Sequence, residues 1–273
     1  MCFNDNFLIK EGYACYYESC DKLYTDLDQH FKSFIKEWNY KTYTIPAMID
    51  GEVLEKCGYF ESFPDQISVV GEIADEKIQH IMEGGKIDES CIKLRNKYLT
   101  PSACLHIYPM YQGKKITKNE VVMTKARVFR CEKSGFNNMT RLWDFSVREI
   151  VFIGSSEFVK ESLEKMKEYV LSFAQKITEE ARVVVAHDHF YKGQRNNIKA
   201  RIQTKNEQKF ELIVPIGNND VSLASFNFHN GHFSIPFEFD NNRQVVSGCV
   251  GFGMERWVAA CLEYGITDLN KIF

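Results

Sequence analysis

The sequence predicts an α+β fold in which one antiparallel β-sheet is flanked by helices. Segments rich in β-branched and aromatic residues, bounded by turn residues, follow one another through the second half of the chain. Two segments with the apolar spacing of an amphipathic helix interrupt these strands without alternating with them. Runs of strands joined by hairpins, with helices set apart, are typical of α+β proteins and not of repeated βαβ units.

Composition limits the classes of protein that fit. The chain of 273 residues is 44% hydrophobic and 14% aromatic, which is enough to bury a full core. Its net charge of −3 argues against a broad basic surface, although a local basic patch for tRNA or another acidic partner stays open. No apolar run approaches the ~20 residues of a membrane helix, and the N-terminus lacks the order of a signal peptide. We therefore expect a cytoplasmic protein without a membrane partner.

The first part of the chain is expected to begin with a helix. Apolar spacing predicts an amphipathic helix at residues 19–38, and an extended stretch follows at 40–49. A short helical piece and an aromatic turn come next around residues 58–64. A second helix is predicted at 72–82, before a pair of glycines.

Strands dominate the rest of the chain. They are predicted at residues 98–111, 125–132, 141–154, 183–188, 199–215, 223–239 and 245–250. Long helices are predicted at 156–178 and 254–264. Because no internal repeat or linker is visible, residues 1–273 are expected to form a single domain, in which the polar stretch 191–206 is a candidate inserted element.

A glycine-rich joint connects the last predicted strand to the last predicted helix. Gly251 and Gly253 let the backbone come close to a ligand, and Arg256 adds a cation beside the amide-rich start of the helix. Phosphate is the natural guest of such a joint. A tight turn with a solvated arginine fits the same stretch about equally well when it is read alone.

A predicted hairpin upstream of this joint carries a second unusual set of side chains. In period-two strands Arg130 and Glu132 share one face, as do Arg141, Phe145 and Glu149. Such a face is costly to bury against an apolar core but suits a nucleoside triphosphate: arginines for phosphate, the ring for stacking and a carboxylate for the base amino group. The alternative is a solvent-facing hairpin with cross-strand ion pairs.

Together these residues resemble the signature motifs of class II aminoacyl-tRNA synthetases. Arg-x-Glu at 130–132, a loop and Arg-Leu-x-x-Phe at 141–145 resemble their second motif, and Gly-x-Gly-x-x-Arg at 251–256 resembles their third. Residues 58–64 are compatible with the weaker first motif, which in that family lies at the dimer interface, so the resemblance implies a homodimer. Within the class, the chain looks most like zinc-dependent archaeal seryl-tRNA synthetases and their truncated relatives, the amino acid:[carrier protein] ligases.

The resemblance to the truncated relatives rests partly on a missing segment. Conventional seryl-tRNA synthetases begin with a coiled-coil arm that grips tRNA, whereas this chain reaches its first motif early and shows no sustained heptads before it. We therefore expect no N-terminal tRNA-binding arm and no tRNA partner. The expected partner is a carrier protein with a phosphopantetheine arm.

The resemblance also implies a catalytic zinc held by Cys104, Glu149 and Cys249. The nine cysteines include no CxxC pair, so they are core thiols, metal ligands or nucleophiles and not a disulfide framework. Two thiolates and one carboxylate leave one position of a tetrahedral zinc open, and a substrate amine can fill it. A fixed metal in a tight pocket would select small amino acids, with glycine or alanine foremost. A buried core thiol is the usual role of any single cysteine.

The resemblance assigns roles to the motif residues. Arg130 would bind the α-phosphate of ATP and Arg141 and Arg256 the β- and γ-phosphates, and these three arginines with Mg²⁺ would offset the charge of the transition state. The implied ATP-binding residues are Arg130, Glu132, Arg141, Phe145, Gly251, Gly253 and Arg256. The implied products are an aminoacyl adenylate and then a thioester of the carrier protein.

Several further positions carry weaker expectations. Ser225 and Asn227 lie where the family places residues that contact the amino acid. The glutamate that seryl enzymes use for Mg²⁺ is not evident, and Glu211 could serve instead. The segment 187–189 (His-Asp-His) is expected at the edge of the pocket or at the carrier-docking surface, because neighbouring strand residues point to opposite faces and would not share a second metal.

A basic segment follows this His-Asp-His run. Arg195, Lys199 and Arg201 could dock an acidic carrier protein, although a plain solvated face fits about as well. Two other functions remain open for the whole chain: a minimal seryl-type aminoacyl-tRNA synthetase, and a non-catalytic paralogue that acts as a regulatory or binding subunit. The presence of all three motif arginines speaks against the paralogue.

Overall fold

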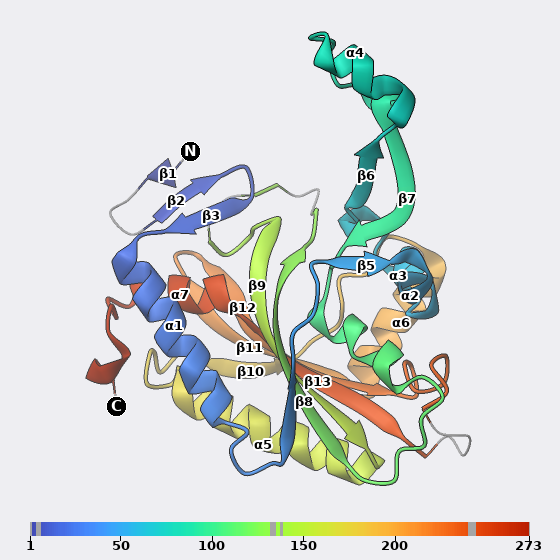
Figure 1. Cartoon of the computed structure of the whole chain (residues 1–273). Helices are drawn as coiled ribbons and strands as arrows, with labels where there is room; N and C mark the ends of the chain where they lie inside the picture. The colour runs from blue at the N-terminus through green and yellow to red at the C-terminus, as the bar shows by residue number, and fades with distance from the viewer. Residues whose placement is uncertain (1, 4–6, 132–134, 137–138, 240–243, 273) are drawn as a thin grey trace.

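A seven-stranded sheet forms the centre of the computed structural model, which describes residues 2–3, 7–131, 135–136, 139–239 and 244–272 (Figure 1). The strand order is β10-β11-β12-β13-β9-β8-β4. Its strands are β4 (Tyr40–Tyr43), β8 (Glu120–Phe129), β9 (Asp144–Gly154), β10 (Arg182–Val185), β11 (Lys209–Ile216), β12 (Asn219–Asn230) and β13 (Val246–Gly253). Among these strands only β4 and β8 pair in parallel. The predicted α+β class is confirmed, and the sheet is mixed at this one edge.

Three helices pack on one face of the sheet (Figure 1). They are α1 (Glu18–Ser33), α5 (Ser156–Ala174) and α7 (Met254–Glu263). Phe31 of α1 stacks on Phe252 of β13 with ring centroids 4.5 Å apart, and Trp257 of α7 packs beside them. Ser155 caps α5 by accepting a hydrogen bond from the N–H of Phe158 at 3.2 Å, which supplies one of the partners that a helix start lacks. These helices cover the first face of the sheet and bury its apolar side chains.

The opposite face of the sheet carries a second core cluster. Its cover consists of α2 (Gly51–Lys56), α3 (Tyr59–Ser62), the 3₁₀ turns η4 (Ala103–His106) and η5 (Tyr108–Tyr111), and a segment at residues 233–239. Alternate residues of β9 serve the two layers: Ile150 and Phe152 belong to the first cluster, Val151 and Ile153 to the second. Burial on both faces explains why this strand reads as a continuous apolar run.

Two smaller sheets complete the described structure. The N-terminal one contains β1 (Cys2–Phe3), β2 (Phe7–Lys10) and β3 (Tyr13–Tyr16), and the other contains β5 (Met48–Asp50), β6 (Val69–Ile73) and β7 (Ile92–Leu99). The β6–β7 ribbon carries α4 (Ile78–Met82) at its tip and projects away from the central sheet (Figure 1). The helix predicted at 72–82 is therefore wrong over its first part, which extends the ribbon and is followed by a 3₁₀ turn at 75–77.

Several other boundaries also differ from the sequence prediction. The strand predicted at 98–111 ends at Leu99, because the chain turns through Pro101 and Pro109 into η4 and η5. The strand predicted at 199–215 begins only at Lys209. Its first residues instead belong to α6 (Gln194–Lys205), and the strand predicted at 223–239 ends at Asn230. In the hairpin, β8 ends at Phe129 and β9 begins at Asp144, so the arginines at 130 and 141 lie outside the strands.

The predicted helices at 19–38, 156–178 and 254–264 are confirmed, each within a few residues, as α1, α5 and α7. None of the helices in the described ranges has the length and apolar character needed to cross a membrane. The apolar spacing along the chain therefore predicted these three long helices, whereas the ends of several strands are set by turns that it did not predict.

A buried ion pair ties α1 to the central sheet. The Arg148 guanidinium on β9 donates two hydrogen bonds of 2.8 Å to the Asp28 carboxylate on α1, and both residues are buried. Burial alone would raise the pKa of Asp28, but Arg148, Lys125 and Lys32 outweigh it and hold the pKa below its usual range. A bidentate pair of this kind is strong only while both partners are present.

We expect the Asp28→Asn substitution to lower the free energy of unfolding by about 3–5 kcal/mol at pH 7, because it leaves the buried Arg148 charge without its partner. Urea unfolding followed by circular dichroism measures this loss. Asp26→Asn, which removes an exposed pair with Lys22 on the same helix, should cost no more than about 1 kcal/mol. Equal losses in the two variants would contradict the role of the buried pair.

Candidate active site

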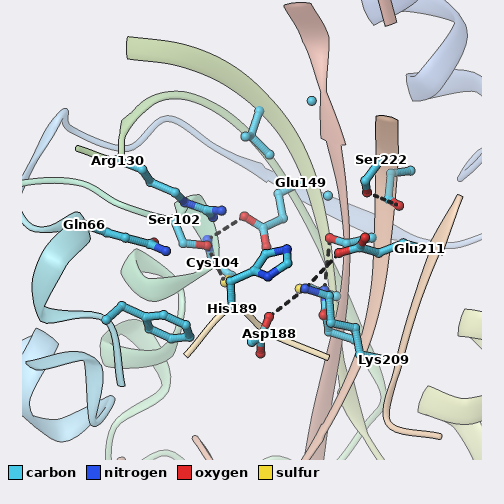
Figure 2. A pocket seen from close by; sticks show the side chains of 18 of the residues that line it. Gln66, Ser102, Cys104, Arg130, Glu149, Asp188, His189, Lys209, Glu211 and Ser222 are labelled. Atoms are coloured by element: carbon cyan, nitrogen blue, oxygen red, sulfur yellow. Dashed lines mark hydrogen bonds and ion pairs between the residues drawn. The ribbon is translucent and has the colours of Figure 1, made fainter. Parts of the chain in front are cut away.

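The residues predicted to bind ligands line one cavity of about 500 Å³ on the second face of the sheet (Figure 2). Strand register explains how they come together, because directly opposed residues of antiparallel strands share a face. Two neighbouring rows cross the sheet in this way. One row contains Glu211, Ser225, Gly251 and Glu149, and the next contains Lys209, Asn227 and Cys249.

Cys104, Glu149 and Cys249 form a buried cluster of metal-ligating side chains. Their ligand atoms all lie within 4.8 Å of one another. Cys104 comes from η4 beneath the sheet, and its backbone N–H donates a hydrogen bond of 2.9 Å to the Glu149 carboxylate (Figure 2). The sequence-predicted trio is therefore brought together from three separate elements.

The donor set of this cluster fits zinc. Two cysteine sulfurs and one carboxylate are ligands that a tetrahedral zinc accepts, with one position left for a substrate. The neighbouring Cys104 thiol, burial and the charge of Glu149 raise the pKa of the Cys249 thiol well above its usual range. Three acidic groups so close together and shielded from water can all ionise only if a cation offsets their charge.

Several uncharged groups that the sequence analysis missed surround the two sulfurs. His229 places Nε2 3.5 Å from the sulfur of Cys249, and Ser102 places its hydroxyl 3.3 Å from the sulfur of Cys104. Burial lowers the pKa of His229 to about 3, so its imidazole is neutral. The signal in the sequence was weak: His229 follows Asn227 by two residues on β12, but an irregularity in the pairing at residues 228–230 interrupts the alternation.

The residues predicted to bind a nucleotide gather at the other part of the same cavity. Arg130, Arg141, Phe145 and Arg256 all line it, and the Arg130 guanidinium carbon lies 5.6 Å from the centroid of the Phe145 ring. Arg130 and Arg141 reach the cavity from the ends of the hairpin, so the strand-parity argument fails for them and holds for Phe145 with Glu149 on β9. Glu132 lies outside the described residues.

Backbone carbonyls hold two of the arginines in place. Arg130 Nε donates to the carbonyl of Pro101 at 2.8 Å. Arg256, at the start of α7, donates from Nε to the carbonyl of Thr140 at 2.8 Å and from Nη1 to the carbonyl of Ser222 at 3.0 Å. These bonds to backbone carbonyls orient the two guanidinium groups, a side-chain type that suits the binding of phosphate.

Gly251 and Gly253 leave the floor between these arginines open. A Cβ added at Gly251 would lie 3.4 Å from the Ser225 hydroxyl, and one added at Gly253 would lie 3.5 Å from Arg256 Cδ. Neither position has a backbone conformation reserved for glycine. A side chain at either position would therefore not clash within the chain. Both glycines line the cavity, so the absence of side chains there leaves more space in the cavity.

A charged network borders the cavity beside the metal-ligating cluster. Lys209 Nζ lies 2.7 Å from Asp188 Oδ1 and 3.1 Å from Glu211 Oε1, and Gln203 of α6 donates to the other Asp188 oxygen at 2.7 Å (Figure 2). Burial alone would raise the pKa of Asp188, but the Lys209 ammonium outweighs it and the pKa falls to about 2. Asp188 and His189 line the cavity, as expected for the 187–189 segment.

The polar segment at 191–206 contains the helix α6, which borders the cavity. Asn196 donates hydrogen bonds to the carbonyls of Glu61 and Tyr191 at 3.0 and 2.9 Å. Lys199 Nζ donates to the Ser62 hydroxyl at 3.0 Å. Lys199 thus faces the α3 layer, whereas Arg195 and Arg201 are exposed. The three predicted docking residues do not lie together on one free surface.

The fold and the site define a class II synthetase-like core: a mostly antiparallel sheet with a cavity on its second face, lined by the three motif arginines and by Gly251 and Gly253. Comparison with known families agrees. The chain belongs to the family described as tRNA synthetase class II core domain (G, H, P, S and T), whose pattern matches residues 89–264. Class II synthetases use ATP and Mg²⁺.

Two kinds of ligase are similar to the chain. Type-2 serine--tRNA ligase of Methanocaldococcus jannaschii is 28% identical over 85% of this chain and 48% of its own length. Amino acid--[acyl-carrier-protein] ligases 1 and 2 of Bradyrhizobium diazoefficiens are each 30% identical, over 82% and 87% of this chain and 72% and 75% of their own lengths. The chain thus spans about half the length of the serine--tRNA ligase.

Solved structures show the same fold. The M. kandleri SerRS, crystallised with A. aeolicus tRNASec, superposes with a TM-score of 0.81 at 18% identity and covers 94% of this chain and 54% of its own. Prolyl-tRNA synthetase from Cryptosporidium parvum, crystallised with halofuginone and AMPPNP, gives a TM-score of 0.71 at 12% identity over 96% of this chain and 50% of its own. At these identities the likeness concerns the fold alone.

We expect Lys209→Met to lower the free energy of unfolding by about 3 kcal/mol at pH 7, because two carboxylates lose their shared cation. Asp188 has a pKa lowered from 3.8 to about 2, so the stability that it contributes is present above pH 4 and lost as the pH falls toward 2. The difference in free energy of unfolding between the variant and the wild type should therefore narrow as the pH falls from 4 toward 2. Urea unfolding at pH 2 to 7 measures it.

Lys205→Met, at the exposed end of the helix α6, is the matched control and should change the free energy of unfolding little at any pH. If the loss of free energy of unfolding in Lys209→Met stays constant from pH 7 to pH 2, then lost packing and not the lost charge causes it.

Proposed function

We propose that the chain uses ATP to activate a small amino acid, glycine or alanine foremost, and transfers it to the phosphopantetheine thiol of a carrier protein. The observation that carries this proposal is the placing of the Cys104, Glu149 and Cys249 cluster in the same cavity as Arg130 and Phe145. Similarity to two amino acid--[acyl-carrier-protein] ligases supports it.

In this proposal the amino acid and the nucleotide occupy adjoining parts of the cavity. Cys104, Glu149 and Cys249 would hold zinc, which when bound supplies a Lewis acid for the uncharged α-amine. Ser225 and Asn227, which follow one another along the same face of β12, are placed to contact the amino acid.

The nucleotide part binds ATP through its arginines. Arg130, Arg141 and Arg256 offset the charge of the phosphates, with Phe145 under the adenine and the glycine floor beneath the triphosphate. Mg²⁺ is expected beside the phosphates, and Glu211, which lines the cavity, is the candidate ligand. Glu132 keeps its proposed role toward the adenine amino group.

The reaction needs no protein nucleophile. A carboxylate oxygen of the amino acid attacks the α-phosphorus, the bond to the bridging oxygen breaks, and pyrophosphate leaves. The thiol sulfur of the carrier then attacks the carbonyl carbon of the adenylate, AMP leaves, and the thiol proton passes to solvent or to a nearby base. The chain contributes position and fixed positive charge.

The helix α6 is the proposed docking site for the carrier protein. Ile198 and Ile202 are about half exposed, at 50% and 49%, and Arg195 and Arg201 are exposed beside them. Apolar side chains flanked by arginines suit an acidic partner. Lys199 would act here mainly by anchoring the helix through Ser62.

We also propose a homodimer, in a cytoplasmic setting. The projecting β6–β7 ribbon exposes apolar side chains that a second copy could cover. They are Val69, Ile78, Met82, Ile87 and Leu94. Exposed apolar side chains gathered on one element are typical of an interaction surface.

A second candidate function is that of a seryl-type aminoacyl-tRNA synthetase, which the similarity to Type-2 serine--tRNA ligases favours. Holo carrier protein and tRNA, each offered with radiolabelled amino acid and ATP, separate the two functions. The proposal expects label on the carrier thiol, released by hydroxylamine, and none on tRNA. Label on tRNA alone would replace it with the second function. Loading of neither acceptor would favour a non-catalytic paralogue.

We expect Cys249→Ala to remove bound zinc and to abolish amino-acid-dependent pyrophosphate exchange. Loss of a ligand should weaken zinc binding by more than the ~10–100-fold cost of an outer-shell partner. Metal analysis and exchange are measured on the same sample. The control is Cys91→Ala, at a buried cysteine just before β7 in the projecting β6–β7 ribbon. This variant should keep both the bound zinc and the pyrophosphate exchange. Full zinc content in Cys249→Ala would contradict the proposed ligand set.

Charge reversal tests the docking helix. The double variant Arg195→Glu and Arg201→Glu should raise KM for the carrier about 10-fold or more at low salt, since two attractive charges become repulsive. Pyrophosphate exchange, which needs no carrier, should stay unchanged. The double variant Lys115→Glu and Lys118→Glu, in an exposed loop away from the cavity, is the charge-matched control. An unchanged KM for the carrier would exclude this surface of α6 as the docking site.

A further inference from the structure

One ligand of the metal-ligating cluster has a second set of contacts that the proposed function does not use. On the β12 side, the sulfur of Cys249 lies 3.5 Å from His229 Nε2 and 3.6 Å from Asn227 Nδ2. Asn227 is the direct cross-strand partner of Cys249, and His229 lies two residues later, at an irregularity of the β12–β13 pairing, with its ring beside the same sulfur. Two nitrogen atoms therefore approach this sulfur from the strand next to its own.

The other nitrogen of the His229 ring is also engaged. Nδ1 lies 3.1 Å from the Ser247 hydroxyl and 3.3 Å from the Tyr108 hydroxyl. Ser247 and Tyr108 are both fully buried. Packing fixes the ring as well, because the rings of His229 and Phe233 meet edge to face with centroids 4.8 Å apart.

The chemistry of the sulfur decides how the protons are arranged. A metal-bound cysteine is a thiolate, which accepts hydrogen bonds and donates none. The nitrogen facing it must therefore carry the proton, so His229 is protonated at Nε2 and its Nδ1 is an acceptor. A buried hydroxyl, Ser247 or Tyr108, donates to Nδ1. Every group in this series then has a partner: hydroxyl to Nδ1, and Nε2–H to sulfur.

We propose that His229 is a positioning residue for the metal ligand Cys249, to whose sulfur it donates a hydrogen bond that holds the side chain in its orientation toward Cys104 and Glu149. The inference rests on the metal centre of the proposed function. A nitrogen that donates a proton to the sulfur cannot also bind the cation, so His229 leaves the fourth position open. Among the described residues, the group of mutually close ligand atoms at this site contains the two cysteines and the glutamate and not His229.

The hydrogen bond has two expected effects on the site. It offsets part of the cost of burying a metal-bound sulfur, whose negative charge needs hydrogen-bond donors around it. It also holds the side chain in the orientation that faces Cys104 and Glu149. Partners of this kind typically contribute 10–100-fold to metal affinity.

The test compares His229→Phe, which keeps the ring and removes the donor, with His229→Gln, whose amide nitrogen can restore it. Zinc dissociation constants come from competition with a chromogenic chelator. Absorption of the Co²⁺-substituted protein reports on the cobalt–thiolate bonds directly. We expect about 10–100-fold weaker zinc binding and a shifted thiolate-to-cobalt band in His229→Phe. His229→Gln should recover most of the zinc affinity and most of the band position. Ser247→Ala should change both quantities less than His229→Phe does.

The control is His232→Phe, the same substitution at a cavity histidine that contacts the carbonyl of Cys57 and not the sulfur. Thermal unfolding of each metal-free variant shows whether it folds. Wild-type affinity and an unshifted band in a folded His229→Phe would overturn the inference while leaving the metal centre intact. A change of cobalt coordination number in His229→Phe would show that His229 is a ligand and would also overturn it. Absence of metal from the wild type would instead refute the centre itself.

Discussion

The buried meeting of two thiols and a carboxylate is the constraint on which the rest of the site depends. Cys104, Glu149 and Cys249 bring their ligand atoms within 4.8 Å of one another in a place shielded from water. Such a set is unfavourable as three separate anions and favourable as the ligands of one cation. A chain that needed only a stable core would be better served by apolar side chains at these positions.

The central sheet supplies the precision that this cluster needs. Glu149 and Cys249 lie on the neighbouring strands β9 and β13, and a slip of either strand by one residue would turn its side chain to the opposite face. The helices behind the sheet hold that register by filling the first face with apolar side chains. The same register brings Gly251 beside Glu149, so the proposed nucleotide part is bordered by the same strands that carry the proposed metal ligands.

Local pattern was sufficient for the long elements and for the residues that follow strand parity. Phe145 and Glu149 share the cavity face of β9 as alternation predicts, and the helices α1, α5 and α7 follow their apolar stripes. The motif resemblance, and not periodicity, identified Cys104, which lies 45 residues from Glu149 and reaches it through a 3₁₀ turn.

What the sequence did not reveal depends on contacts between distant segments. Lys209 sits among Asp188, Glu211 and Gln203, and no pattern along the chain shows that these residues meet. The part of the helix α6 from residue 199 onward was assigned to a strand, and the inward polar bonds of the helix became visible only with α3 in place. The placing of Arg130 and Arg141 beyond the strand ends likewise follows from the hairpin turn.

Amino acid activation in a single cavity, dependent on a bound metal, is the central claim. It is tested most directly by ATP–pyrophosphate exchange across a panel of amino acids, with zinc determined on the same purified sample. The account predicts about one zinc per chain and exchange that depends on glycine, alanine or another small amino acid and is lost when the metal is removed. Exchange with no amino acid, in a folded sample that binds no zinc, would contradict it.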